Sequence, residues 1–197
     1  MPSDIRIYQD QMVALLRQIY PQPIELVAEW RSITTIPNVY SPRLDIAVGP
    51  FSTVRGGNRI ADYDDLMRES QSFIETLTHY HSRNITHFGE DRFSYPTDLP
   101  LFNVLMRHNQ NARCFIAVEI ENDVTRKHLL GGALNASALG RIGIAIGWSE
   151  KKVIALVRLR EYWNFLASVN KNTFNTANLL ILSPTQFRSA IESASAE

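Results

Sequence analysis

The chain has 197 residues, of which 45% are hydrophobic, and this suits one domain over 1–197 with a substantial core. Its 20 basic residues balance 20 acidic ones, which argues against a polycationic nucleic-acid binder but leaves a local basic groove possible. The sequence has neither an apolar signal core nor a window of the roughly 18 apolar residues that span a membrane. With one cysteine, Cys114, which we expect in the core, it can form no internal disulfide, and we expect a cytoplasmic location.

The first half of the chain predicts three helices and one strand, separated by turns that contain proline. Apolar residues at helical spacing indicate the helices, and the alternation in "RLDIAVGPF" indicates the strand. In chain order these are a helix over 4–20 that Ser3 or Asp4 caps, a short helix over about 24–32, a strand over 43–51 and a helix over 62–81. Residues 82–111 are polar and irregular, so we expect an insertion with helical and irregular parts over about 50–112.

The second half begins with a strand–helix–strand unit of the kind that builds a parallel strand pair. Its parts are the strand "RCFIAVEIE", the helix "DVTRKHLLGGALNASALG" and the strand "RIGIAIGW". Gly140 is the expected C-cap of this helix. Asn135 is either a hydrogen-bonded core residue or a residue that faces the site, and we favour the core. A strand in "KKVIALV", a helix in "REYWNFLASVN", a strand in "NLLILS" and a helix that begins at Pro184 complete the chain. The fold class is α/β, with a mixed β-sheet flanked by helices.

Three acids interrupt strands that are otherwise apolar: Asp45, Glu119 and Glu121. Residues two apart in a strand share a face, so Glu119 and Glu121 point the same way. If the two strands are neighbours, the three carboxylates converge, and such hard oxygen ligands suit Mg²⁺ or Mn²⁺. A cation of this kind activates a bound water and stabilises the charge on a phosphoryl group, so the pattern indicates metal-dependent phosphodiester hydrolysis.

Structural roles for these acids stay open alternatives. A solvated edge strand would show the same spacing as Glu119 and Glu121. Asp45 could instead cap a turn or pair with Arg43 or Arg141. The choice depends on which strands are neighbours in the sheet.

The order of these acids resembles the PD-(D/E)XK nuclease superfamily, which has the restriction-endonuclease-like fold. "SPRLD" supplies Asp45, with Pro42 three residues before it rather than adjacent, and "VEIEN" supplies Glu119 with Glu121 where lysine is usual, a Glu-x-Glu variant known among restriction endonucleases. The resemblance covers roughly 24–50 and 110–148, and the separation of 74 residues (119 − 45) implies the insertion. It implies a Mg²⁺- or Mn²⁺-dependent endonuclease acting on nucleic acid, with DNA favoured over RNA.

The resemblance also suggests further site residues. Glu29 or Glu25 would supply an acid that the family often has on its first helix, and Lys127 could return the ammonium that Glu121 does not provide. The candidate phosphate contacts are Arg55, Arg59, Arg126 and Lys127.

A second hypothesis is a catalytically inactive binding or interaction module with the same fold, because the usual lysine is missing. Tyr162, Trp163 and Phe165 would then be candidate surface aromatics, although they suit the core equally well. A homodimer is compatible with both hypotheses.

Overall fold

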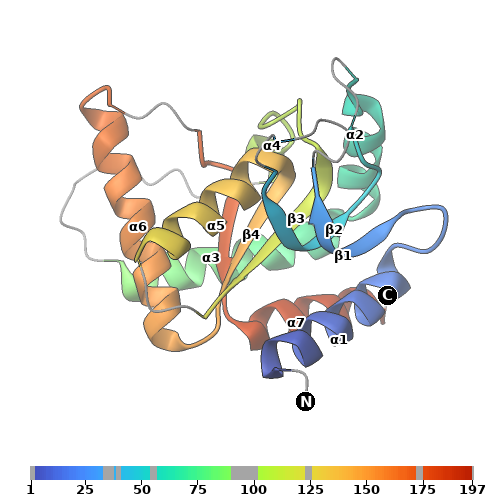
Figure 1. Cartoon of the computed structure of the whole chain (residues 1–197), viewed down its shortest axis with the longest axis horizontal. Coiled ribbons are helices and arrows are strands. Elements are labelled where there is room, and N and C mark those ends of the chain that lie inside the picture. Colours follow the sequence, from blue (N-terminus) through green and yellow to red (C-terminus); the bar gives the residue numbers. More distant parts are fainter. Residues whose placement is uncertain are drawn as a thin grey trace.

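A mixed β-sheet of five strands forms the centre of the molecule, and helices flank it (Figure 1). The computed structural model describes residues 3–32, 38, 41–53, 57–89, 102–122, 126–171 and 175–196, without the side chains of Arg126 and Lys127. The sheet has the order β1-β2-β3-β4-β5, with bounds Leu26–Arg31, Arg43–Val48, Cys114–Glu121, Gly140–Gly147 and Leu179–Leu182. Strands β1, β2 and β3 are antiparallel neighbours, whereas β3, β4 and β5 run parallel. The expected α/β class with a mixed sheet is confirmed.

Two hydrophobic clusters join the helices to the two faces of the sheet. One face carries the isoleucine and valine side chains of β3 and β4 and packs mainly against α1 (Asp4–Ile19), α3 (Gln71–Phe88) and α7 (Pro184–Ala194). The other carries alanines and packs against α5 (Arg126–Leu139) and α6 (Glu150–Ser168). Cys114 is fully buried in this second cluster, as expected. None of the helices in the described ranges is long and apolar enough to cross a bilayer.

Strand β1 replaces the short helix expected over about 24–32, so that prediction was wrong. Valine and tryptophan favour strands, and pairing with β2 satisfies the backbone groups of the segment. A helical interpretation of six residues depends on spacing alone, which a neighbouring strand overrides. The consequence is that Glu29 lies on the sheet rather than on a helix.

The apolar run "KKVIALV" is not a strand but the first part of α6, which continues without a break to Ser168. Periodicity cannot separate a buried helix from a buried strand over so short a run. Because β4 and β5 are parallel, the chain needs a crossover between them, and α6 provides it.

The inserted region is more helical than expected. The helix predicted over 62–81 is two helices, α2 (Ile60–Glu69) and α3, which meet at Ser70. Helix α3 continues to Phe88, so the start of the segment expected to be irregular is helical, and α4 (Phe102–Leu105) follows. Residues 90–101 of that segment lie outside the described residues.

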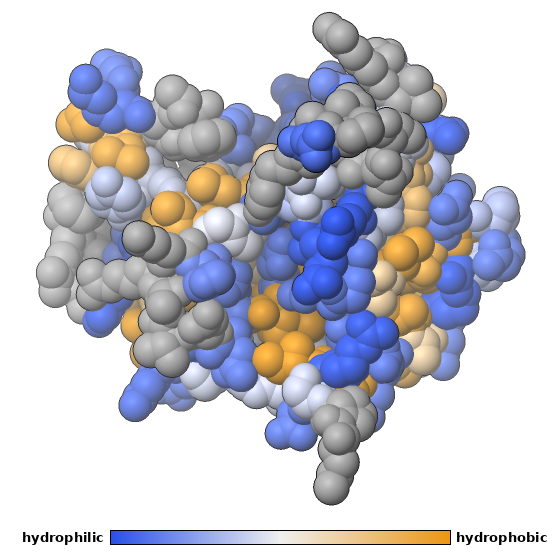
Figure 2. Space-filling model, viewed as in Figure 1, coloured by the Kyte–Doolittle hydropathy of each residue, from blue (hydrophilic) through white to orange (hydrophobic). Residues whose placement is uncertain are grey.

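The aromatic residues of α6 divide between core and surface. Trp163 is buried in the cluster below α6, whereas Tyr162 is 52% exposed and Phe165 is 36% exposed. Figure 2 shows hydrophobic side chains over this end of the helix. Two of the three aromatics therefore lie at the surface.

Candidate carboxylate site

The sheet register places acids of three neighbouring strands in one row. In the β1–β2 pairing, the residues on either side of Glu29 pair with those on either side of Asp45, so the two acids lie opposite each other. In the β2–β3 pairing the ladder ends at Ile46 and Val118, and Asp45 and Glu119 are the next residues along the two strands. The side chains of Asp45 and Glu119 are hydrogen-bonded to each other although 74 residues (119 − 45) separate them in the chain, and Glu29 acts on Asp45 through its charge. We call Glu29, Asp45, Glu119 and Glu121 the carboxylate site.

A backbone donor of the next strand holds Asp45. The N–H of Ile120 donates to Oδ2 of Asp45 at 2.7 Å. Burial raises the pKa of Asp45, the negative charge of Glu29 raises it further, and the Ile120 hydrogen bond and the charge of Arg43 oppose the increase. The side chain of Asp45 is thus held in place, and the groups that lower its pKa only partly offset those that raise it.

The pKa of Glu119 is strongly raised. Its side chain is 8% exposed, and burial raises its pKa to about 9, with the charges of Asp45 and Glu121 adding to the effect. A carboxyl group with this pKa holds its proton at neutral pH and can share it with Asp45, to which it is hydrogen-bonded. Like charges this close cannot both persist without a proton or a cation between them.

Asn135 of α5 takes part in this arrangement, so of its two expected positions the one facing the site is correct and the favoured core position is wrong. Its side chain is hydrogen-bonded to Glu119, and this contact lowers the pKa of the glutamate. It is only half-buried. The sequence shows a polar residue within an apolar helix, but whether the Asn135 side chain points towards the acids depends on how α5 packs on the sheet.

Glu121 lies beneath α5 at the end of β3 and is 7% exposed. A Cβ atom on Gly132 would overlap Oε1 of Glu121 and would lie 3.6 Å from Cβ of Glu119. The helix therefore approaches both glutamates closely because Gly132 has no side chain. Strand β3 has neighbours on both sides, so the solvated edge-strand alternative for Glu119 and Glu121 is wrong.

Glu29 is held at the solvent side of the carboxylate site by three groups that sequence reasoning missed. The Nε of Arg43 lies 2.6 Å from its carboxylate, and a guanidinium nitrogen of Arg6 lies at 3.8 Å. The Nε2 of Gln9 donates to Glu29 at 3.2 Å and also to the backbone oxygen of Asp45. Gln9 is 2% exposed and ties α1 to β1 and β2. Its only sequence signal is a polar residue within the apolar stripe of α1.

The two arginines considered as partners of Asp45 pair with other acids. Arg43 pairs with Glu29, although its charge still acts on Asp45. Arg141 is fully buried and pairs with Asp64 at 2.7 Å.

Of the four candidate phosphate contacts, only Arg59 has a side chain that the structure describes. Arg59 immediately precedes α2, is exposed, and pairs with Asp62 at 3.2 Å. The segment before α2 leaves the sheet beside the start of β3, where Ser52 N–H donates to Arg113 O, so the structure does not bring Arg59 to the carboxylate site. Arg55 lies outside the described residues, as do the side chains of Arg126 and Lys127.

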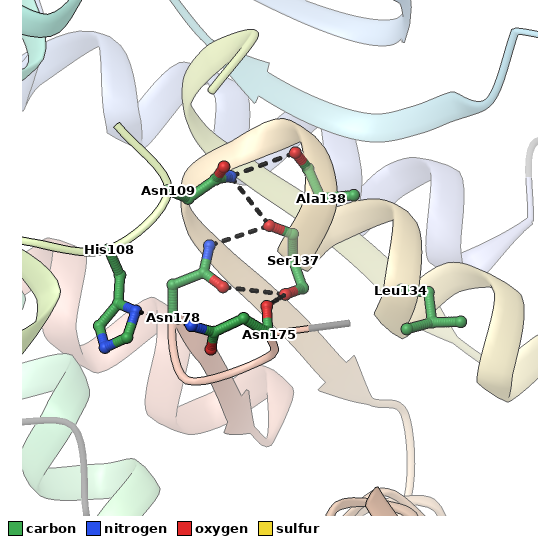
Figure 3. A pocket seen from close by; sticks show the side chains of 7 residues that line it. All are labelled: His108, Asn109, Leu134, Ser137, Ala138, Asn175 and Asn178. Carbon is green, nitrogen blue, oxygen red and sulfur yellow. Dashed lines mark hydrogen bonds between the residues drawn. The ribbon is translucent and has the colours of Figure 1, made fainter. Parts of the chain in front are cut away.

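A polar cavity of about 300 Å³ lies at the opposite end of β3 and β4 (Figure 3). Its amide side chains serve the C-terminus of α5: Nδ2 of Asn109 and Nδ2 of Asn178 both donate to backbone oxygens of Ser137 and Gly140. These side chains satisfy carbonyls left free at a helix end, a role expected for Gly140 alone. Gly140 is instead the first residue of β4, where a Cβ would lie 2.8 Å from that of Ala117.

Comparison of the chain with family models, curated proteins and solved structures found no match. The function of the carboxylate site is therefore inferred from the chemistry of its residues.

The donor set suits a hard divalent cation, because Asp45 and Glu119 offer carboxylate oxygens in a buried place where burial raises the pKa of both acids. Mg²⁺ commonly takes one or two protein carboxylates and completes its shell with water and substrate phosphate. Across the described ranges, no three His, Cys, Asp or Glu side chains already form a metal-binding group. Asp45 and Glu119 are therefore the pair that fits, with Glu29 and Glu121 beside them.

Proposed function

We propose that the protein hydrolyses phosphodiester bonds of nucleic acid with the help of Mg²⁺ or Mn²⁺, and that DNA is the substrate to test first. The observation that carries the proposal is the burial of Glu119 against Asp45, with a pKa raised to about 9. Such crowding of acids weakens a fold and is found where charge is used for binding or catalysis. A divalent cation would offset the mutual repulsion of Asp45, Glu119 and Glu121.

The order of the elements supports the same proposal. The two parts of the motif that resembles the PD-(D/E)XK superfamily lie on adjacent strands, β2 and β3, and α5 and β4 continue the chain as that fold requires. Helices α2, α3 and α4 occupy the insertion implied by the long spacing of the motif. We therefore propose a restriction-endonuclease-like fold of the Glu-x-Glu type.

The proposed roles follow from the contacts. Asp45 and Glu119 would hold the cation, oriented by the Ile120 N–H and by Asn135. A bound Mg²⁺ or Mn²⁺ lowers the pKa of its water and neutralises charge on the phosphoryl group. Glu121 lies on the same face and would accept a proton from the attacking water.

Metal binding and cleavage test the proposal together. Calorimetric titration with Mn²⁺ should show binding to the wild type that Glu119→Gln abolishes. Glu75→Gln, an exposed glutamate on α3, is the matched control and should bind as the wild type does. Plasmid DNA and RNA should be cut with Mg²⁺ or Mn²⁺ but not with EDTA, and Asp45→Asn should lose this activity while folding normally. Intact substrates with every cation would refute the proposed function.

An inactive binding or interaction module is the second candidate. One observation in its favour is that Glu119 can share a proton with Asp45, because a carboxyl pair of this kind persists without a cation. A second is that Tyr162 is exposed on α6, where a partner could contact it. Failure of Mn²⁺ to bind at the carboxylate site would favour this candidate. The homodimer and the cytoplasmic location stay predictions under both.

A further inference from the structure

The carboxylate site has arginines at its solvent side. Arg43 of β2 and Arg6 of α1 contact the carboxylate of Glu29, and their side chains are 59% and 44% exposed. The charge of Arg43 also acts on Asp45, so it lies within electrostatic reach of the proposed catalytic groups. Neither arginine was among the phosphate contacts expected from the sequence.

We propose that Arg43 and Arg6 bind a backbone phosphate of the nucleic-acid substrate next to the bond that is cut. The inference rests on the proposed function and names the residues that attach the substrate. An acidic site repels a phosphodiester, so a substrate needs positive groups at the rim to approach it. Arginine suits this role because its planar fork donates two parallel hydrogen bonds to one phosphate.

Glu29 takes the place of the phosphate when no substrate is bound. Its contact with Arg43 uses the Nε atom at 2.6 Å, and the Arg6 contact is longer, at 3.8 Å. Exposed ion pairs contribute only about 0–1 kcal/mol, so a phosphate can displace Glu29 at little cost. Gln9 keeps Glu29 beside Asp45 from the buried side, so Arg43 needs only to turn from Glu29 to the phosphate. Arg6 also pairs with Asp10 at 3.3 Å, one helical turn further along α1, and can reach the phosphate from there.

A second arginine–acid pair provides a matched control. Arg68 and Asp65 on α2 are joined at 2.8 Å, with side chains 61% and 69% exposed. This pair has the same chemistry as Arg43 and Glu29 and an arginine of similar exposure, although its acid is more exposed than Glu29, and its two residues lie within one helix. Substitutions there remove the same charges without touching the carboxylate site.

The test measures binding of a short labelled DNA duplex, and of the matching RNA, in EDTA so that no cleavage occurs. Arg43→Gln and Arg6→Gln should each weaken binding about fivefold to tenfold at low salt and reduce the slope of log K against log salt by about 0.9 for each phosphate that the variant no longer neutralises. Glu29→Gln should change affinity in the opposite direction, because it removes the competing anion. Arg68→Gln and Asp65→Asn should bind as the wild type does.

The outcomes separate this inference from the proposed function. If the wild type binds and cleaves nucleic acid while Arg43→Gln and Arg6→Gln keep its affinity and salt slope, the arginine site is refuted and the nuclease proposal stands. If Arg68→Gln weakens binding as much as Arg43→Gln, a general charge effect replaces the site. If the wild type binds neither DNA nor RNA at low salt, both proposals fail. Thermal unfolding of each variant checks that it is folded.

Discussion

Replacing Glu119 by glutamine should stabilise the protein at neutral pH when no divalent cation is present. The pKa of Glu119 is raised from an ordinary value of 4.5 to about 9, chiefly by burial. The folded state therefore keeps a proton that the unfolded chain releases, so the wild type loses stability as the pH rises from about 4.5 towards 9. Glutamine has the shape of a protonated glutamate, can donate to Asp45, and has no proton to lose.

The magnitude follows from the same pKa. At pH 7 the carboxyl group of Glu119 in the unfolded chain is about 2.5 pH units above its pKa. At about 1.4 kcal/mol per unit, its deprotonation favours the unfolded state by roughly 3 kcal/mol. We expect Glu119→Gln to match the wild type near pH 5 and to exceed it by about this amount at pH 7. The same substitution should abolish any stabilisation by Mg²⁺, because it removes a proposed ligand.

Urea denaturation in EDTA at several pH values between about 5 and 8 measures this effect. The difference in unfolding free energy between Glu119→Gln and the wild type reports the titration of Glu119 together with its coupling to Asp45 and Glu121, because the remaining titrating residues are common to both. Glu75→Gln should show a difference that is small and independent of pH. A difference for Glu119→Gln that does not grow with pH, or that favours the wild type at neutral pH, would refute the reasoning.

Three further predictions concern the packing of helices against the sheet. Gly143→Ala should destabilise the protein by several kcal/mol in thermal or urea unfolding, because the added Cβ would lie 2.7–2.8 Å from the backbone of α5. Gly131→Ala should instead stabilise it by about 0.5–1 kcal/mol, because the added Cβ would meet no atom of another element within 4 Å and alanine favours a helix. His81 is fully buried and accepts a backbone N–H of β5 at 2.9 Å. Burial and then the charge of Arg160 lower the pKa of His81 to about 3. The contribution of neutral His81 to stability is therefore present above about pH 6.5 and is lost as the pH falls towards 3. His81→Gln should remove this pH dependence in acid denaturation. Asn178→Ala should destabilise by about 1–2 kcal/mol in urea, because it removes one of the two amide groups that donate to the carbonyls of Ser137 and Gly140 and also removes the acceptor of the Ser137 hydroxyl; a loss below about 0.5 kcal/mol would contradict this capping role.

Much of the sheet could be predicted because its signals are local. Strands β2, β3 and β4 are short apolar runs bounded by turns, and the helix between β3 and β4 has helical spacing and small residues. Pro184 begins α7 as expected, and Ser183 before it provides the capping box. Such features depend on residues within a few positions of one another, so a linear sequence displays them.

Strand β1 and the first part of α6 could not be distinguished in this way. Both are short apolar segments whose backbone conformation depends on the neighbour that completes their hydrogen bonds. Pairing with β2 makes the first a strand, and the crossover between parallel strands makes the second a helix.

The sequence alone determined that acids stand in apolar strands at Asp45, Glu119 and Glu121, because a charge within an apolar run is visible without a structure. Only the tertiary structure decided that Glu29 and Asn135 join them, that Gln9 anchors the row, and that arginines lie at its rim. It also decided the pKa of Glu119, since burial and neighbouring charge exist only once distant segments have packed together. Proximity between residues far apart in the chain is a property of the fold, and the chemistry of this site depends on that proximity.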